Sequence, residues 1–132
     1  LVIDGLKRVD DDVELLRQRK SLLKHSSGAV QFTIVRRFDT SQECLDILKK
    51  DGFISIGTAP ISSHEQNYFL HESKLDQPKL AIWFGDEANG LTDNVLKQCE
   101  FCLTIEMEGK VESLNLATTT GIVLYEAVKQ RK

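Results

Sequence analysis

Two glycine-bearing stretches of the sequence hold residues that could bind a ligand. The first is FGDEANGLT, in which Gly85 and Gly90 bracket a polar loop directly after an apolar run. Glycine permits positive φ and lets the backbone approach a bound molecule closely. The loop lacks the Gly-Lys-Ser/Thr ending of a phosphate-binding P-loop and the G-x-G-x-x-G fingerprint of dinucleotide-binding proteins. Taken alone, it also fits a glycine-rich turn that leads into a capped helix.

The second stretch is IEMEGKVESLN, residues 105–115, which ends on Ser113-Leu114-Asn115 against an apolar helical pattern. Serine and asparagine are both good helix N-caps, so a capping role is open to Ser113 and to Asn115. A capping role and a role in a site are compatible, because one side chain at a helix start can serve both.

The elements that must position these stretches follow from the hydrophobic pattern. It predicts strands at 1–4, 32–35, 53–58, 80–84 and 101–105, and helices at 10–24, 40–50, 92–98 and 114–130, with an irregular segment at 61–78. Such alternation predicts an α/β fold with a mainly parallel sheet and helices on both faces. Ligands in such folds gather at the carboxyl ends of the strands, which here means the loops at 58–60, 85–91 and 106–115.

Composition sets the limits of the interpretation. The 132 residues fit one domain, and no apolar run approaches the roughly 18 to 20 residues that a membrane span needs. No signal or transit segment is recognisable, so we expect a cytoplasmic protein without membrane contact. The net charge of −3 does not indicate a nucleic-acid-binding protein, although a local basic patch is enough for one.

The cysteines and histidines do not indicate a metal site. Cys99 and Cys102 form a C-x-x-C, but no second ligand pair accompanies them and the segment leads into a strand. We interpret them as two semi-buried thiols at a helix-to-strand junction. The three histidines are scattered without ligand spacing, so no metal is expected.

The spacing of the two loops resembles a known family. The pair G-x-E-x-x-G-L and I-x-M-x-G-x-V-x-S-L-N, with the second running into a C-terminal helix that contains LYEA, closely resembles motifs two and three of the SpoU (TrmH-like) class of the SPOUT RNA methyltransferases. Upstream, HSSGAVQFTIVRR and LKKDGFISIGTAP are similar to further segments of that class. The resemblance covers nearly the whole chain, so we expect one SpoU-type methyltransferase domain over residues 1–132.

This resemblance implies a fold and a cofactor. The fold would be an α/β domain whose C-terminal segment passes through a loop to form a deep trefoil knot, a rare exception to the usual topology rules. S-adenosylmethionine would bind in the knot, where apolar walls and backbone groups suit an adenine ring. The positions that match the expected cofactor pocket are Thr58, Ala59, Gly85, Gly90, Ile105, Met107 and Leu114.

The resemblance also implies the reaction and the partners. The methyl group would go to a ribose 2′-hydroxyl of tRNA or rRNA, a poor nucleophile that must be oriented and helped to lose its proton. Glu87, Ser113 and Asn115 match the polar positions of the motifs and are the candidate catalytic residues. Homodimers through the C-terminal helix are usual in the class. For RNA phosphates we expect contacts from a basic cluster, which comprises Arg19, Lys20, Arg36 and Arg37.

The sequence departs from the family at several positions. Glu106 stands where proline is usual, Asp86 replaces an amide, and LATTTG follows Asn115. The first family motif, N-x-G-x-x-x-R, whose arginine is credited with activating the ribose hydroxyl, has no counterpart. The chain also starts at Leu1 and its only methionine is Met107, so we expect that an N-terminal strand and helix are missing.

Two other classes of function remain open at this point. One is a catalytically incomplete knotted module for RNA binding or dimerisation, which the missing arginine and the acidic balance would fit. The other is a doubly wound nucleotide-binding domain of a different kind, which predicts an unknotted C-terminus and binding of ATP or NAD.

Overall fold

The computed structural model describes residues 1–4, 18–86, 88–110 and 113–132. The chain divides into two compact units. The larger unit contains Leu1–Leu6 and Thr40–Lys132, and the smaller contains Lys7–Asp39. Each unit is described by itself.

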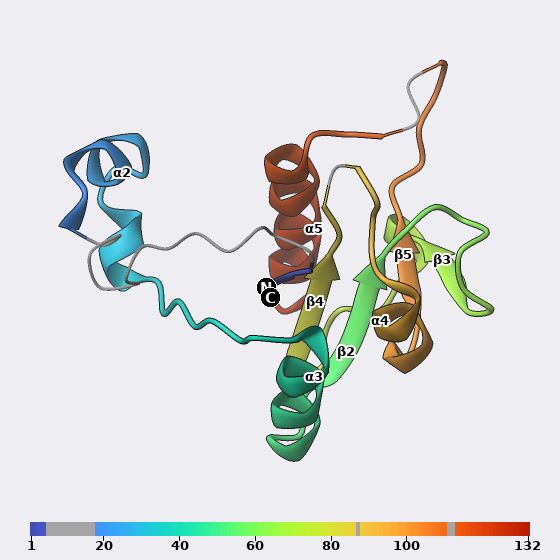
Figure 1. The fold of residues 1–132 in the computed structure, drawn as a ribbon. Coiled ribbons are helices and arrows are strands. Elements are labelled where there is room, and N and C mark those ends of the chain that lie inside the picture. Colours follow the sequence, from blue (N-terminus) through green and yellow to red (C-terminus); the bar gives the residue numbers. More distant parts are fainter. Residues whose placement is uncertain (5–17, 87, 111–112) are drawn as a thin grey trace. The chain divides into compact units, whose positions relative to one another are not determined.

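A five-stranded parallel sheet forms the centre of the larger unit (Figure 1). The strand order is β1-β4-β2-β5-β3, and each neighbouring pair is parallel. The strands are β1 (Val2–Ile3), β2 (Ile54–Thr58), β3 (Asn67–Phe69), β4 (Leu80–Phe84) and β5 (Cys102–Thr104). The predicted α/β fold with a parallel sheet is therefore confirmed, and its carboxyl edge collects the loops after β2, β4 and β5.

Helices cover both faces of this sheet. α3 (Ser41–Lys50) and α4 (Asp93–Gln98) contact β2 and each other, and Figure 1 shows α5 (Leu116–Gln130) on the opposite side of the sheet. α3 begins as predicted, because the Thr40 side chain accepts a hydrogen bond from the Glu43 N–H at 3.1 Å. It ends at Lys50, and Gly52, with a φ of +80°, lies in the turn that follows.

The main hydrophobic core lies between the sheet and α5. Alternate residues of the strands point to this side, so that Ile56, Phe84 and Leu103 pack with Val123 of the helix. Val123 is fully buried. The core thus holds α5 firmly behind the carboxyl ends of β2, β4 and β5.

A buried carboxylate connects β1 to both helices of the other face. The Asp4 side chain, 3% exposed, accepts hydrogen bonds from the Ser41 hydroxyl, from the Thr92 N–H at 3.1 Å and from the Thr92 hydroxyl at 2.9 Å. Ser41 opens α3, and Thr92 is the N-cap of α4. Anionic groups are stabilised at helix N-termini, and this one joins three elements that are distant in the sequence.

The predicted strand at 32–35 is wrong. The smaller unit contains α2 (Lys20–His25) and a short 3-10 helix, η1 (Ala29–Phe32), and no regular structure follows at residues 33–38. Phe32 and Ile34 are 88% and 81% exposed. Ser27 and Gly28, both at positive φ, reverse the chain after α2 as the sequence suggests. β-propensity alone did not create a strand here, because no neighbouring strand pairs with these residues in the described part of the chain.

The prediction also missed one strand. β3 and the 3-10 helix η2 (Leu70–Glu72) lie within the segment 61–78 that was expected to be irregular. β3 is only three residues long and begins with the polar Asn67, so its sequence carries little of a strand pattern. It forms because β5 offers an edge, with Tyr68 beside Leu103.

Candidate donor pocket

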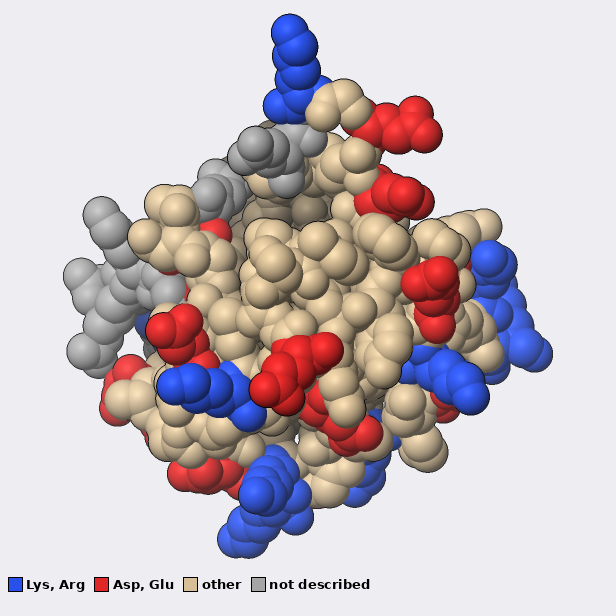
Figure 2. Space-filling model, turned by 90° about the vertical axis from the view of Figure 1, so that its right-hand side faces the viewer, with Lys and Arg blue, Asp and Glu red and all other residues tan. Residues whose placement is uncertain are grey.

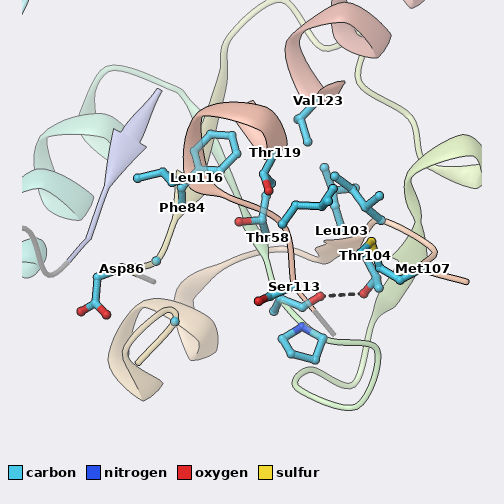
Figure 3. Close-up of a pocket in the computed structure, with 16 residues that line it drawn as sticks. Thr58, Phe84, Asp86, Leu103, Thr104, Met107, Ser113, Leu116, Thr119 and Val123 are labelled. Atoms are coloured by element: carbon cyan, nitrogen blue, oxygen red, sulfur yellow. Dashed lines mark hydrogen bonds between the residues drawn. The ribbon is translucent and has the colours of Figure 1, made fainter. Parts of the chain in front are cut away.

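Three loops at the carboxyl edge of the sheet surround one cavity of about 190 Å³ together with the start of α5 (Figure 3). The lining residues come from the ends of β2, β4 and β5 and from the segment that leads into α5. They are Thr58, Ala59, Pro60, Phe84, Gly85, Asp86, Gly90, Leu103, Thr104, Ile105, Met107, Ser113, Leu114, Leu116, Thr119 and Val123. We call this cavity the donor pocket, because the resemblance predicts that the methyl donor S-adenosylmethionine binds here.

The loop after β4 folds back tightly on itself. A Cβ atom on Gly85 would lie 2.0 Å from the Gly90 carbonyl carbon, so no side chain fits there. Gly90 has a φ of +68°, and its N–H bonds to the Asp86 carbonyl at 3.0 Å. Glycine at both positions is therefore required for different reasons, close backbone approach at Gly85 and backbone conformation at Gly90.

The Asp86 carboxylate stabilises the same loop. It accepts hydrogen bonds from the Ala88 N–H at 2.8 Å and the Asn89 N–H at 2.7 Å. The bonds from Asn89 and Ala88 lower the pKa of Asp86 below its usual value. Figure 3 shows the carboxylate pointing away from the other labelled side chains. Of the described residues that line the donor pocket, Asp86 alone is charged.

The segment after β2 is held by neighbouring strands. The Thr58 hydroxyl donates to the Trp83 carbonyl at 3.1 Å, and the Ala59 N–H donates to the Leu103 carbonyl at 3.0 Å. The Thr104 hydroxyl contacts the Ala59 carbonyl at 2.7 Å, which is the dashed line in Figure 3. This wall of the donor pocket is therefore fixed to β4 on one side and to β5 on the other.

The opposite wall comes from the start of α5. Asn115 is the N-cap of this helix, and its side-chain oxygen accepts from the Ala117 N–H at 2.8 Å. The capping role considered for Asn115 is thus present. Ser113 lines the donor pocket, and so do Leu116, Thr119 and Val123 on successive turns of the helix.

The structure brings most of the predicted site residues together. All seven predicted cofactor residues line the donor pocket: Thr58, Ala59, Gly85, Gly90, Ile105, Met107 and Leu114. Ser113 does so too, whereas Asn115 is not among the described residues that line it. Glu87 lies outside the residues that the structure describes. Whether these side chains bind a cofactor or act in catalysis stays a prediction.

Sequence reasoning missed several pocket residues. Phe84 and Leu103 had a signal, since Phe84 ends one apolar strand, Leu103 lies near the end of another, and ligands gather where such strands end. Thr119 and Val123 had a weaker one, the spacing of four that places them on one face of α5. Pro60 and Asp86 lay inside the predicted ligand loops, and Thr104 and Leu116 lay close to the ends of the third, but none was named as a site residue. Each of these eight residues lines the donor pocket.

The C-x-x-C pair lies at the junction of α4 and β5, as the sequence predicts, but it is buried more completely than the expected semi-buried thiols. Cys44, Cys99 and Cys102 are free and buried. Burial, with a smaller effect from Cys102, raises the pKa of Cys99 to about 12. A thiol that holds its proton this strongly is a poor nucleophile and a poor metal ligand. Within the described ranges, no group of three or more His, Cys, Asp and Glu residues is arranged to hold a metal ion.

The predicted RNA-contacting residues are exposed. Arg19, Lys20, Arg36 and Arg37 all belong to the smaller unit. On the face that Figure 2 shows, acidic and basic side chains are interspersed around an uncharged central area. No helix within the described part of the chain is long and apolar enough to cross a membrane.

Comparison with known proteins agrees with this geometry. Residues 9–125 match the model of the SpoU rRNA methylase family. The chain belongs to the SpoU rRNA methylase family. Its relative in Photobacterium profundum, the 23S rRNA (guanosine-2′-O-)-methyltransferase RlmB, is 34% identical over 109 residues. That match covers 83% of this SpoU chain and 42% of the relative, so the chain spans less than half of that protein.

Solved structures show the same fold. An RNA 2′-O ribose methyltransferase crystal structure superposes with a TM-score of 0.73 at 26% identity and covers 98% of this SpoU chain and 55% of that chain. The SpoU methyltransferase AviRb from Streptomyces viridochromogenes, solved in complex with AdoMet, gives a TM-score of 0.75 at 24% identity, with coverages of 98% and 48%. The parallel sheet and its covering helices are therefore those of the SpoU methyltransferases.

Proposed function

We propose that this chain binds S-adenosylmethionine in the donor pocket as part of an enzyme that methylates a ribose 2′-hydroxyl of RNA. The observation that carries the proposal is the convergence of the two motif-bearing loops and the loop after β2 on one cavity in a member of the SpoU family. The relatives named above are RNA 2′-O-methyltransferases, which supports the same reaction class here.

The residues present fit this cofactor. Phe84, Leu103 and Leu116 supply apolar wall for an adenine ring, and the loop backbones supply polar groups. A Cβ at Gly90 would meet no atom within 4 Å, so the glycine leaves open space at the wall of the pocket. S-adenosylmethionine supplies an activated methyl group on a positively charged sulfonium. No described lysine or arginine lines the donor pocket, so its walls place no positive charge against that centre.

The chain's own residues have distinct roles in this proposal. Ser113 lines the pocket and would orient the ribose hydroxyl by a hydrogen bond. Asn115 would act by fixing the start of α5 through its cap, which places Leu116 and Thr119 against the ligand. Glu87, from the loop after β4, is the candidate to assist loss of the proton. We also propose that the C-terminal segment forms the trefoil knot typical of the family.

The RNA partner is proposed from the relatives and from the basic residues. The relative from Photobacterium acts on 23S rRNA by its name, and a relative in Borreliella burgdorferi, 28% identical over 98% of this chain and 52% of its own, is named an uncharacterized tRNA/rRNA methyltransferase. We propose rRNA or tRNA as the substrate. The exposed Arg19, Lys20, Arg36 and Arg37 would contact phosphates, so binding should weaken steeply with salt.

A homodimer is proposed on the basis of α5. The side of this helix that faces away from the core exposes apolar residues on successive turns, at Ile122, Leu124, Tyr125 and Val128. Tyr125 is 73% exposed, which is unusual for a residue in such a stripe unless a partner covers it. A cytoplasmic location also stays a prediction.

Calorimetric titration with S-adenosylmethionine, followed by transfer of labelled methyl groups to RNA, tests the proposal. Saturable binding with incorporation into the 2′-position supports the enzyme. Binding without incorporation, in a protein that includes the family's first motif, supports the RNA-binding module instead. Absence of binding by such a protein contradicts the donor pocket.

A further inference from the structure

Asn67 and Thr104 make a set of hydrogen bonds that none of the family motifs includes. The Asn67 side-chain N–H donates to the Pro60 carbonyl at 2.7 Å, and its oxygen lies 2.8 Å from the Thr104 hydroxyl. The same hydroxyl contacts the Ala59 carbonyl at 2.7 Å. We call these three contacts the Asn67–Thr104 brace.

The orientation of the Asn67 amide follows from its partners. The Pro60 carbonyl can only accept, so the NH₂ group must face it, and the amide oxygen then faces Thr104. The Thr104 hydroxyl has one proton, which it shares between two nearby oxygens. The brace therefore holds only with an amide at position 67 and a hydroxyl at position 104.

The brace fixes a wall of the donor pocket. Ala59, Pro60 and Thr104 all line the pocket, and both carbonyls of this wall are engaged by the brace. The Pro60 carbonyl also accepts from the Ser63 N–H at 3.0 Å, within its own turn. Without Asn67 the turn would keep that local bond but lose its connection to β3.

We propose that Asn67 is a positioning residue for the donor pocket, which sets the Ala59–Pro60 wall before the cofactor binds. The inference rests on the proposed function. A wall already held in its bound geometry lowers the entropy cost of binding, so the brace strengthens cofactor affinity without touching the cofactor. Asn67 is only partly buried, so we expect its side chain to contribute less to the free energy of folding than to the free energy of cofactor binding.

Two substitutions separate the brace from a charge effect. Asn67→Asp keeps the oxygen toward Thr104 but sets an unprotonated oxygen against the Pro60 carbonyl, and Asn67→Leu removes both bonds without adding charge. Both should raise the Kd for S-adenosylmethionine about three- to tenfold, the equivalent of one neutral hydrogen bond. If negative charge near the pocket were the only effect, Asn67→Asp would bind the cationic donor more tightly.

Asn94 provides the matched control, because it lies on α4 and its side chain bonds only to exposed groups of α3 and α4. Asn94→Asp and Asn94→Leu should leave the Kd within about twofold of wild type. Thr104→Val should bind as the Asn67 variants do, because it removes the hydroxyl of the brace. Melting temperatures without donor should change little in all five proteins.

The outcomes separate the two claims. If both Asn67 variants bind S-adenosylmethionine with the wild-type Kd, the inference about the brace is wrong and the proposed function is unaffected. A lowered melting temperature with unchanged Kd also overturns the inference about the brace, because that pattern shows a structural role only. A wild-type protein that binds no donor overturns the proposed function itself, and the inference with it.

Discussion

Gly57 lies in β2 and Gly85 directly follows the neighbouring strand β4, yet their surroundings differ completely. A Cβ on Gly57 would lie 2.8 Å from a Leu91 methyl carbon, 3.0 Å from the Cys102 sulfur and 3.4 Å from the Cys99 sulfur, so this side of β2 is closed by side chains. Gly85 instead meets the backbone of its own loop, and beyond that loop the donor pocket opens. Gly57 therefore marks tight packing of side chains, whereas Gly85 marks the edge of the donor pocket.

Gly85→Ala should have the largest effect. The added Cβ would clash with backbone atoms of Gly90 and Leu91, which have no rotamer to change, so the loop must move. We expect a loss of about 3 kcal/mol in the free energy of unfolding and no measurable donor binding. Urea denaturation and calorimetry measure the two effects.

Gly121→Ala is its control, because a Cβ there meets nothing within 4 Å and the residue lies inside α5. Alanine is the better helix former, so this variant should gain about 0.5 kcal/mol. Equal stability of the two variants would contradict the close approach at Gly85.

Gly57→Ala should destabilise the chain by about 2 kcal/mol, since the clash falls on side-chain atoms that can shift. The double variant with Cys102→Ala should recover part of this loss, because the smaller side chain leaves room for the new methyl group. A double-mutant cycle from urea denaturation measures the coupling. Additive losses would mean that the thiols do not close this side of β2.

Gly90→Ala should affect the ligand more than the fold. The left-handed backbone at φ +68° costs an alanine about 1 kcal/mol, and this residue lines the pocket, so a change of its backbone alters the pocket wall. Donor affinity should fall about tenfold, as for a loss of 1.4 kcal/mol. Gly52→Ala, at φ +80° after α3, should cost the same stability and leave the Kd unchanged. A Kd that shifts equally in both would show that backbone strain alone causes the change.

The buried thiols should make stability depend on alkaline pH. Burial raises the pKa of Cys99 from 9.0 to about 12, so between these values the folded chain keeps a proton that the unfolded chain releases. The stabilisation is complete below pH 9 and is lost as the pH rises toward 12, by about 1 kcal/mol between pH 9 and 10. Urea midpoints of wild type and Cys99→Ala should therefore diverge in slope above pH 9. Parallel slopes would contradict a buried, protonated Cys99.

Asp86→Asn should have the smallest effect. An asparagine side-chain oxygen can accept the same N–H bonds from Ala88 and Asn89, so the loop keeps its shape while the pocket edge loses a charge. Because the carboxylate is solvated, we expect the Kd for the cationic donor to rise only about twofold at low salt and to match wild type at high salt. A tenfold change that persists in high salt would show a direct contact with the ligand.

The parts of the structure that the sequence predicted are those with local causes. Thr40 caps α3, Gly52 lies in the turn that follows it, and the apolar run 80–84 forms an interior strand, because each depends on residues within a few positions. The loops with Gly85, Gly90 and Ser113 were placed at one edge because the carboxyl ends of parallel strands meet there. The interpretation of the C-x-x-C as free thiols at a helix-to-strand junction was also correct, although both are buried and not semi-buried.

The errors involve partners that a linear sequence does not reveal. Residues 32–35 have the composition of a strand but lack a neighbour to pair with among the described residues, whereas the polar start of β3 pairs with β5. In the donor pocket, too, the position of a residue depends on neighbours that are distant in the sequence. Thr119 lines the pocket whereas the adjacent Thr120 bonds to the Leu116 carbonyl, and only the rotation of α5 distinguishes these two identical residues.

The Asp4 carboxylate has a consequence for synthesis on the ribosome. Val2 pairs with Trp83, and Asp4 bonds to Thr92, so β1 cannot take its place until some ninety residues have been translated and have emerged from the exit tunnel. Contacts this distant in the sequence form late and slow the search for the native topology. During elongation β1 is therefore without its β4 partner until most of this chain has been synthesised.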